Sequence, residues 1–356
     1  MSPYLEQEFV EILNSQDPEV FNSLLQAAHN TRIRHLGNEV YLRGLIEFSN
    51  YCPRNCLYCG LRKSNENIHR YQLDEEKIIE LAMMAYDLGL QSIALQSGEI
   101  DSQGQVDLLA AIVEKIILSS KQRGHQGLGV TLSVGELSYQ QYLQLWQAGA
   151  HRYLLRIETS DPQLFKKIHP PSQLYDRRLE CLDALKDIGY QVGTGIMVGL
   201  PGQNSEQLAQ DLTFFQKRDI DMLGLGPYIP HSDTPLARVP DSKERDVFTL
   251  TIKMLALARL TMPDINMVAS TALQSINPLG LRLGLMAGAN IIMPVLTPEE
   301  NRGDYSLYDN KEQKSMEEIT AEVEAGGFKL GYWKWGDSPH YFWRQEEVKR
   351  AKSFNI

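Results

Sequence analysis

From residue 39 onward, short apolar segments rich in β-branched residues alternate along the chain with longer amphipathic segments. The apolar segments have the length and composition of strands. They span residues 39–49, 91–98, 129–135, 152–159, 191–199, 222–229, 266–271 and 289–296. Three of the amphipathic, helix-like segments end at a glycine just before the next strand, at Gly89, Gly149 and Gly189. This alternation predicts an α/β fold with a parallel sheet, and eight strand–helix units favour closure into a (βα)8 TIM-type barrel. An open doubly wound sheet is the alternative.

The residues outside this alternation predict two additions to the barrel. The first 38 residues have the pattern of two short helices, and no Pro-, Gly- or Ser-rich linker interrupts the chain. We therefore expect an N-terminal helical extension over residues 1–38, a barrel over residues 39–296, and a C-terminal cap or tail of the same domain over residues 297–356.

Composition excludes several classes of function. The chain has 356 residues, 43% of them hydrophobic, and a formal net charge of −10 without any run of lysine or arginine. We therefore expect a folded protein that does not bind nucleic acid. The start of the chain is acidic and amphipathic, unlike a signal peptide, and no apolar run is long enough to span a membrane. Cytoplasmic localisation without membrane attachment is the expectation.

The barrel prediction also indicates where the chemistry lies. In barrels of this kind the active site is at the C-terminal ends of the strands. The segments at those ends are residues 49–59, 96–99, 133–136, 156–159, 199–203, 226–231, 270–272 and 293–297.

Three of the chain's four cysteines, Cys52, Cys56 and Cys59, lie within eight positions directly after the first predicted strand. Their spacing fits one face of a helix, although the segment contains proline and glycine, which disfavour a helix. A zinc site needs a fourth ligand; Cys181 is more than a hundred residues away, and His69 is the nearest histidine. A disulfide is disfavoured in a reducing compartment. A further interpretation is a 4Fe–4S cluster held by the three thiolates. Such a cluster normally takes four cysteines, so that three leave one iron open.

The pattern C-x3-C-x2-C after the first strand, with Tyr58 just before the third cysteine, resembles the radical S-adenosylmethionine (SAM) enzymes. The resemblance implies that the open iron binds the amino and carboxylate groups of SAM. It also implies reductive cleavage of SAM to methionine and a 5′-deoxyadenosyl radical. Because the clustered cysteines suffice for one cluster, we expect an external electron donor of the flavodoxin or ferredoxin type.

Further segments at the predicted strand ends match motifs of this family. Residues 96–99 are similar to its glycine–glutamate motif, whose backbone receives the SAM ammonium, and residues 195–203 resemble its segment beside the adenine. Glu158 is placed like the acid that binds the ribose, Arg178 like the arginine that pairs with the SAM carboxylate, and Met222 like a residue beside the nucleoside. The resemblance implies a SAM site made of Tyr58, Gln96, Ser97, Gly98, Glu99, Ser133, Arg156, Glu158, Arg178 and Met222.

Within the superfamily, "CLYCGLR" (56–62) and "PHSDTPLA" (230–237) resemble the HydE group of FeFe-hydrogenase maturases more than biotin synthase or the methylornithine synthase PylB. That resemblance implies a small organometallic substrate, a cysteine-ligated Fe(CO)2CN unit, and HydG- and HydF-like maturation partners. The residues expected to line the substrate cavity are Thr131, Arg152, Ser270, Thr271, Tyr305 and Tyr308.

Some positions depart from the HydE pattern. Ile157 stands where a histidine is expected, and Val295 and Leu296 replace an amide and an indole. We expect these three side chains at the mouth of the cavity, where they make it less polar. The substrate therefore stays open between the maturase role and a HydE-like or methylornithine-synthase-like enzyme that acts on another small molecule.

Overall fold

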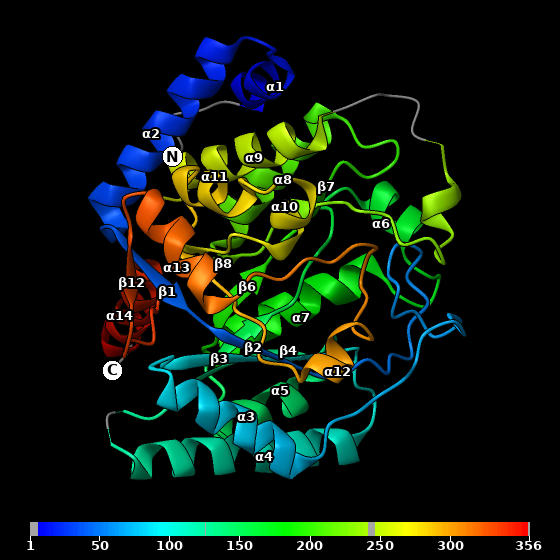
Figure 1. Cartoon of the computed structure of the whole chain (residues 1–356), viewed down its shortest axis with the longest axis vertical. Helices are drawn as coiled ribbons and strands as arrows, with labels where there is room; N and C mark the ends of the chain where they lie inside the picture. The colour runs from blue at the N-terminus through cyan, green and yellow to red at the C-terminus, as the bar shows by residue number, and fades with distance from the viewer. Residues whose placement is uncertain (1–5, 125, 241–245, 355–356) are drawn as a thin grey trace.

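A ring of parallel strands forms the centre of the molecule (Figure 1). The computed structural model describes residues 6–124, 126–240 and 246–354. Seven strands pair side by side in the order β10-β8-β6-β5-β4-β3-β2. The ring closes through β11, because Ala269 N donates to Ile291 O at 3.0 Å on one side, and Leu45 N donates to Pro294 O at 2.8 Å on the other. The predicted closed barrel is therefore confirmed, and the open sheet is wrong.

Each of the eight predicted strand segments contains at least one strand, and three of them contain two. The strands are β1 (Glu39–Leu42), β2 (Gly44–Ser49), β3 (Ser92–Ser97), β4 (Gly129–Ser133), β5 (Arg152–Leu154), β6 (Gln191–Thr194), β7 (Met197–Val198), β8 (Met222–Leu223), β9 (Gly226–Pro227), β10 (Asn266–Met267), β11 (Ile291–Ile292) and β12 (Lys329–Gly331). The two segments that contain β6 and β8 are each interrupted directly after that strand, at Gly195 and at Gly224. These two glycines lie against each other, and a Cβ on Gly195 would clash with the carbonyl of Gly224. Only residues without a side chain allow the two segments to approach this closely.

Helices surround the ring and cover its outer face (Figure 1). Capping boxes begin four of those described, at Ser102, Ser138, Asn204 and Ser315. Gly89, Gly149 and Gly189 all have positive φ, as predicted for residues that end helices. The helices are α1 (Glu6–Asn14), α2 (Pro18–Leu36), α3 (Glu75–Asp87), α4 (Gln103–Gln122), α5 (Tyr139–Gln147), α6 (Pro162–Ile168), α7 (Tyr175–Ile188), α8 (Ser205–Arg218), the 3-10 helix η1 (Leu236–Arg238), α9 (Val247–Thr261), α10 (Thr271–Ile276), α11 (Gly280–Met286), α12 (Glu299–Arg302), α13 (Met316–Ala325) and α14 (Pro339–Phe354).

The N-terminal extension packs on the barrel through two helices. α1 contacts α8 and α9, and α2 contacts α9. Lys253 of α9 donates hydrogen bonds to the carbonyls of Ile12 and Ser15 at the end of α1, at 3.0 and 2.5 Å. One expected detail is wrong: α2 has 19 residues and is not a short helix.

The C-terminal part covers both ends of the barrel. Residues 303–312, which we call the cap loop, lie over the C-terminal ends of the strands, where Gly60 N donates to Leu307 O at 3.1 Å. At the opposite end, β12 pairs with β1, and Asp337 forms a buried ion pair with Arg152 at 2.6 Å. The division at residues 38/39 and 296/297 stays a prediction, and residues 1–5 and 355–356 of its outer segments lie outside the described residues.

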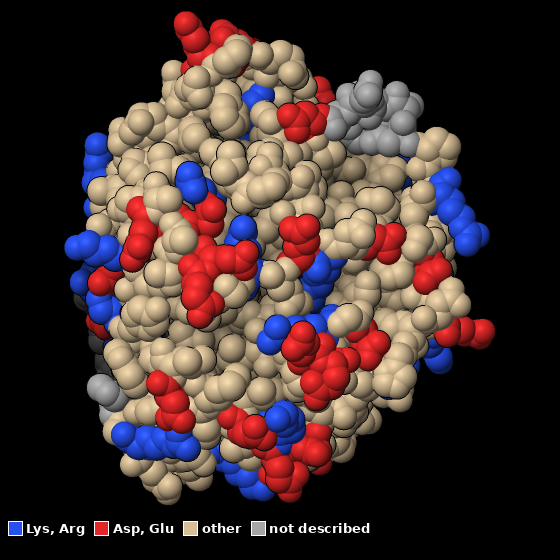
Figure 2. Space-filling model, viewed as in Figure 1, with Lys and Arg blue, Asp and Glu red and all other residues tan. Residues whose placement is uncertain are grey.

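Acidic and basic side chains are interspersed on the face shown in Figure 2. Within the described part of the chain, no helix combines the length and the apolar character that crossing a membrane requires.

Candidate functional site

A cavity of about 340 Å³ is lined by side chains from the C-terminal ends of the strands, the loop after β2 and the cap loop. Most of the predicted site residues meet there. Those that line the cavity are Cys52, Cys56, Tyr58, Cys59, Gln96, Ser97, Gly98, Glu99, Ser133, Arg156, Glu158, Arg178, Ser270, Thr271, Tyr305 and Tyr308. Their individual roles stay predictions.

The cysteines lie on an irregular loop between β2 and α3, so the alternative of a helix face is wrong. Arg70 organises this loop by donating hydrogen bonds to the carbonyls of Asn50, Leu61 and others at 2.6–3.2 Å. Asn50 is fully buried and donates to Asp304 O of the cap loop at 2.8 Å. The loop is therefore fixed by internal bonds and by its cover.

Two glycines allow the cysteine loop to pack tightly against its neighbours. A Cβ on Gly98, just after β3, would clash with the carbonyl of Tyr51 and with the side chain of Cys52. A Cβ on Gly60 would clash with Ser306 O and with the ring of His231. Backbone therefore approaches backbone at both places, and only glycine permits this.

The three clustered thiols fit a 4Fe–4S cluster better than the alternatives. All are free, so no disulfide forms among them, and Cys181 lies apart in α7, where it donates weakly to Leu137 O. Among the residues that the structure describes, no three His, Cys, Asp or Glu side chains converge as a single metal ion requires. His69 is largely exposed and pairs with Asp304. A cluster offers separate irons to separate thiolates, which is consistent with three thiols that line one cavity.

The protonation of these thiols is consistent with the same interpretation. Burial raises the pKa of Cys59 to about 12 and raises that of Cys52, and burial and then the neighbouring cysteines raise the pKa of Cys56 well above its ordinary value. Three thiolates side by side are therefore unfavourable without a cation, and iron supplies that positive charge when it is bound.

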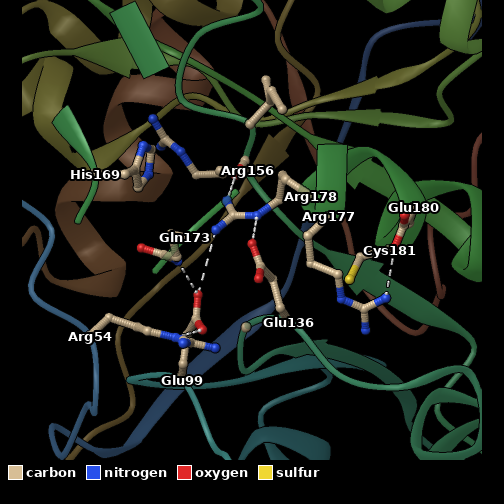
Figure 3. A network of polar contacts seen from close by, with 12 residues as sticks. Arg54, Glu99, Glu136, Arg156, His169, Gln173, Arg177, Arg178, Glu180 and Cys181 are labelled. Carbon is tan, nitrogen blue, oxygen red and sulfur yellow. Dashed lines mark hydrogen bonds and ion pairs between the residues drawn. The ribbon is translucent and has the colours of Figure 1, made fainter. Parts of the chain in front are cut away.

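Glu99 is the centre of a polar network (Figure 3). Arg54 donates to it at 2.6 Å, Gln173 donates to it at 3.0 Å, and Arg178 lies 3.5 Å away. Arg178 is held further by Glu136 at 2.6 Å. Although burial opposes it, the carboxylates of Glu136 and Glu99 raise the pKa of Arg178, so its guanidinium stays charged.

Arg178 has its orientation fixed within the protein. Besides its two carboxylate partners, it donates to the carbonyl of Arg156. A guanidinium has five N–H donors, so hydrogens remain for a ligand carboxylate after these three contacts. The arrangement suits the predicted role at the SAM carboxylate.

Glu158 has a left-handed backbone, with φ of 65°. Hydrogen bonds on both sides impose this conformation, since its N–H donates to Gly195 O at 2.9 Å and its carbonyl accepts from Met197 N at 3.1 Å. The side chain accepts from Arg156 at 2.9 Å. A strained residue that its surroundings hold this firmly is typical of a functional site.

Three of the predicted site residues do not line the cavity: Thr131, Arg152 and Met222. Thr131 lies two positions before Ser133 on β4, one layer deeper in the barrel. Met222 begins β8, and its sulfur lies 3.1 Å from Arg43 Nη1 in the interior. Arg152 is tied to the segment that seals the far end of the barrel. Side chains fill a barrel in layers, and only the last layer reaches the active-site end. These three residues lie in deeper layers and do not line the cavity, and their roles stay predictions.

The departures from the HydE pattern also lie outside the cavity lining. Ile157 is fully buried in the hydrophobic core, while its neighbours Arg156 and Glu158 face the cavity. Leu296 packs against Gly44, and Val295 forms a bridge with Leu45. The expectation that these three make the cavity mouth less polar is therefore wrong.

Sequence reasoning missed an ion pair in the cavity wall. Glu47, in the middle of β2, and Lys311, in the cap loop, lie 2.5 Å apart with side chains 1% and 9% exposed. Glu47 also accepts weakly from Thr297 at 3.4 Å, and Lys311 donates to the carbonyl of Tyr305 at 3.2 Å. A glutamate inside an apolar strand is the one local signal that could have indicated Glu47.

Comparisons with known proteins agree with this geometry. Residues 46–215 match the model of the radical SAM superfamily. The chain is 44% identical to the FeFe-hydrogenase maturase subunit HydE of Thermotoga maritima, over 85% of this chain and 83% of that protein. The chain belongs to the radical SAM superfamily. It is 28% identical to the 3-methylornithine synthase of Methanosarcina barkeri, over 89% of this chain and 88% of that protein.

A solved structure shows the same fold. The crystal structure of the methylornithine synthase PylB superposes with a TM-score of 0.78 at 26% identity, and the match covers 93% of this chain and 96% of that one. Membership of the radical SAM superfamily implies a 4Fe–4S cluster and SAM. Which side chains bind them stays a prediction.

Proposed function

We propose that this chain is a HydE-type radical SAM maturase that acts in assembly of the FeFe-hydrogenase active site. In this role it cleaves SAM reductively and uses the 5′-deoxyadenosyl radical on a small, cysteine-ligated iron complex. The observation that carries the proposal is the 44% identity to Thermotoga maritima HydE over 85% of the chain. The position of Ile157, Val295 and Leu296 away from the cavity lining supports it, because the cavity keeps its polar groups despite these departures.

Cys52, Cys56 and Cys59 would hold the cluster through three of its irons. When bound, the cluster supplies the single electron that cleaves SAM to methionine and the 5′-deoxyadenosyl radical. We propose a flavodoxin or ferredoxin as the source of that electron.

The other residues that line the cavity near the cysteines would bind and orient SAM. The backbone at Gly98 takes the ammonium, Arg178 takes the carboxylate, and Glu158 takes the ribose hydroxyls. Arg178 and Glu158 are held by other protein groups, so they need little reorganisation when SAM binds. Tyr58 precedes the third cysteine, and its hydroxyl lies 3.3 Å from Nε2 of His169.

Side chains from the other side of the ring and from the cap loop would hold the second substrate. Ser270 and Thr271 follow β10, and Tyr305 and Tyr308 come from the cap loop. Tyr305 accepts from Gln96 at 3.1 Å, which ties the two halves of the cavity together. The buried hydroxyl of Ser270 has no protein partner among the described residues, so it is available to a ligand.

A second candidate follows from the structural match to PylB and the 28% identity to a 3-methylornithine synthase. In that case the cavity would hold a small amino acid in place of an iron complex. The lower identity makes this the weaker candidate, and the test below separates the two.

The test is anaerobic turnover of the reconstituted full chain with dithionite and SAM. 5′-Deoxyadenosine and SAM consumption are measured with a synthetic iron–cysteine dicarbonyl cyanide complex, with L-lysine (an isomer of 3-methylornithine), or with neither. Consumption of the iron complex together with an adenosylated product supports the maturase role. Formation of 3-methylornithine, or SAM cleavage that ignores both additions, contradicts it. HydG- and HydF-like partners and a cytoplasmic location stay predictions.

A further inference from the structure

Gln173 lies between the cysteine loop and the polar network around Glu99. It belongs to the loop that joins α6 to α7, is 4% exposed and lines the cavity. Its side-chain oxygen accepts from the thiol of Cys56 at 3.1 Å, and its nitrogen donates to Glu99 at 3.0 Å. Figure 3 shows the amide pointing toward Glu99. The sequence-based set of site residues did not include it.

The position of this amide is fixed from several sides. Gln173 N donates to Pro170 O at 2.9 Å, which closes a turn just before α7. The same segment binds the cysteine loop, since Leu57 N donates to Ile168 O at 2.9 Å. Glu99 is held by Arg54 at 2.6 Å. The amide therefore stays beside Cys56 whichever form the sulfur takes.

The chemistry of the sulfur changes when it binds iron. A thiol donates a hydrogen bond, whereas a thiolate ligand only accepts. An amide oxygen is repelled by a thiolate, but the NH2 group of the same amide carries two hydrogens. For this NH2 group to reach the sulfur, the amide must turn about the last side-chain bond from the orientation in the structure, where its oxygen faces Cys56 and its nitrogen faces Glu99.

We propose that Gln173 is a positioning residue that donates a hydrogen bond to the Cys56 thiolate and raises the reduction potential of the cluster. The inference rests on the proposed function, in which Cys56 is a cluster ligand. Reduction adds negative charge to the cluster and its thiolates, so a donor on sulfur stabilises the reduced form more than the oxidised form. An amide supplies that donor without adding a charge to a cavity that already holds several ion pairs.

The test is a potentiometric titration of the anaerobically reconstituted full chain, followed by electron paramagnetic resonance of the reduced cluster in the absence of SAM. Gln173→Met keeps the length of the side chain and removes the donor. We expect full iron and sulfide content and a lower reduction potential than the wild type. Gln173→Glu, which removes the donor and adds negative charge, is expected to lower the potential further.

Gln91→Met is the matched control. Gln91 is equally buried, but it lies at the opposite end of the barrel, where it donates to Gly127 O at 2.6 Å. Its replacement should leave the potential unchanged, because no cluster ligand is near it.

The outcomes separate this inference from the proposed function. A Gln173→Met cluster with wild-type potential overturns the inference and leaves the proposed function standing. A wild-type chain that assembles no 4Fe–4S cluster overturns both. Where the methionine variant does not retain a cluster, the glutamate variant decides, since a potential equal to or above that of the wild type contradicts the inference.

Discussion

Replacing Lys311 with methionine tests the ion pair in the cavity wall. Lys311 and Glu47 are 2.5 Å apart and almost fully buried. Lys311→Met removes the cation and keeps most of the side-chain volume. Among the described residues, it leaves the Glu47 carboxylate with the weak contact to Thr297 at 3.4 Å and the charge of Arg302. The variant should fold but be clearly less stable than the wild type.

The expected loss follows from the burial of the pair. Breaking a buried ion pair by removing one partner costs about 3–5 kcal/mol, because the other charge stays buried without compensation. A chain of 356 residues has an unfolding entropy of roughly 0.75 kcal/mol/K near its midpoint. The midpoint of thermal unfolding should therefore fall by about 4–7 °C. Removing both charges, in Glu47→Gln with Lys311→Met, should restore most of that loss.

The loss should also depend on pH. Burial raises the pKa of Glu47 above its ordinary value of 4.5, and Lys311 opposes that shift. Without Lys311 the pKa of Glu47 rises further. A carboxyl group whose pKa is higher in the folded than in the unfolded protein gains stability as the pH falls. The difference between variant and wild type should therefore be smaller at pH 5 than at pH 8.

Thermal unfolding followed by circular dichroism at the two pH values is the assay. Lys77→Met is the control, because Lys77 pairs with Glu80 on the exposed surface of α3, where such a pair is worth less than about 1 kcal/mol. Equal losses in the Lys311 and Lys77 variants would refute the reasoning. So would a double variant no more stable than Lys311→Met alone.

Three further predictions concern the cluster, the cysteine loop and the core. Cys56→Ser should abolish cluster assembly, measured as bound iron and sulfide, with the circular dichroism of the barrel unchanged, whereas Cys181→Ser should assemble it normally. Gly98→Ala should weaken SAM binding by about 10- to 100-fold in equilibrium dialysis, because its Cβ clashes with the cysteine loop. Gly104→Ala is the control and should leave SAM binding unchanged, because its Cβ has no neighbouring atom within 4 Å. Burial raises the pKa of Asp211 to about 7. The stability of the wild type should therefore fall as the pH rises from 4 to 7, because the buried carboxyl group becomes charged. The Asp211→Asn variant should be about 2–4 kcal/mol more stable than the wild type at pH 8, but not at pH 4.

The sequence predicted the barrel because its signals are local. Each strand is a short apolar run, and each helix has its own periodicity and end signals, so the units could be read one at a time. The C-terminal ends of the strands then placed the cysteines, Gly98, Glu99 and Glu158 at one cavity.

Depth within the barrel and distant contacts could not be read in the same way. Alternation predicts which face of a strand a side chain is on, but not which layer. The resemblance alone implied a place at the SAM site for Met222, which does not line the cavity. The contact between Gln173 and Cys56 joins positions 117 residues apart, and that between Lys311 and Glu47 joins positions 264 apart. Such pairs exist only after the ring has closed, and no local pattern marks them.

The cap loop has a consequence for how the protein is made. Leu307, whose carbonyl binds Gly60 beside the third cysteine, follows it by roughly 250 residues. At 5–20 residues per second, the ribosome finishes the cover about 12–50 s after the cysteine loop. During that interval the three thiols of the nascent chain lack this cover. The rate of translation therefore sets how long the three thiols stay without the cap loop.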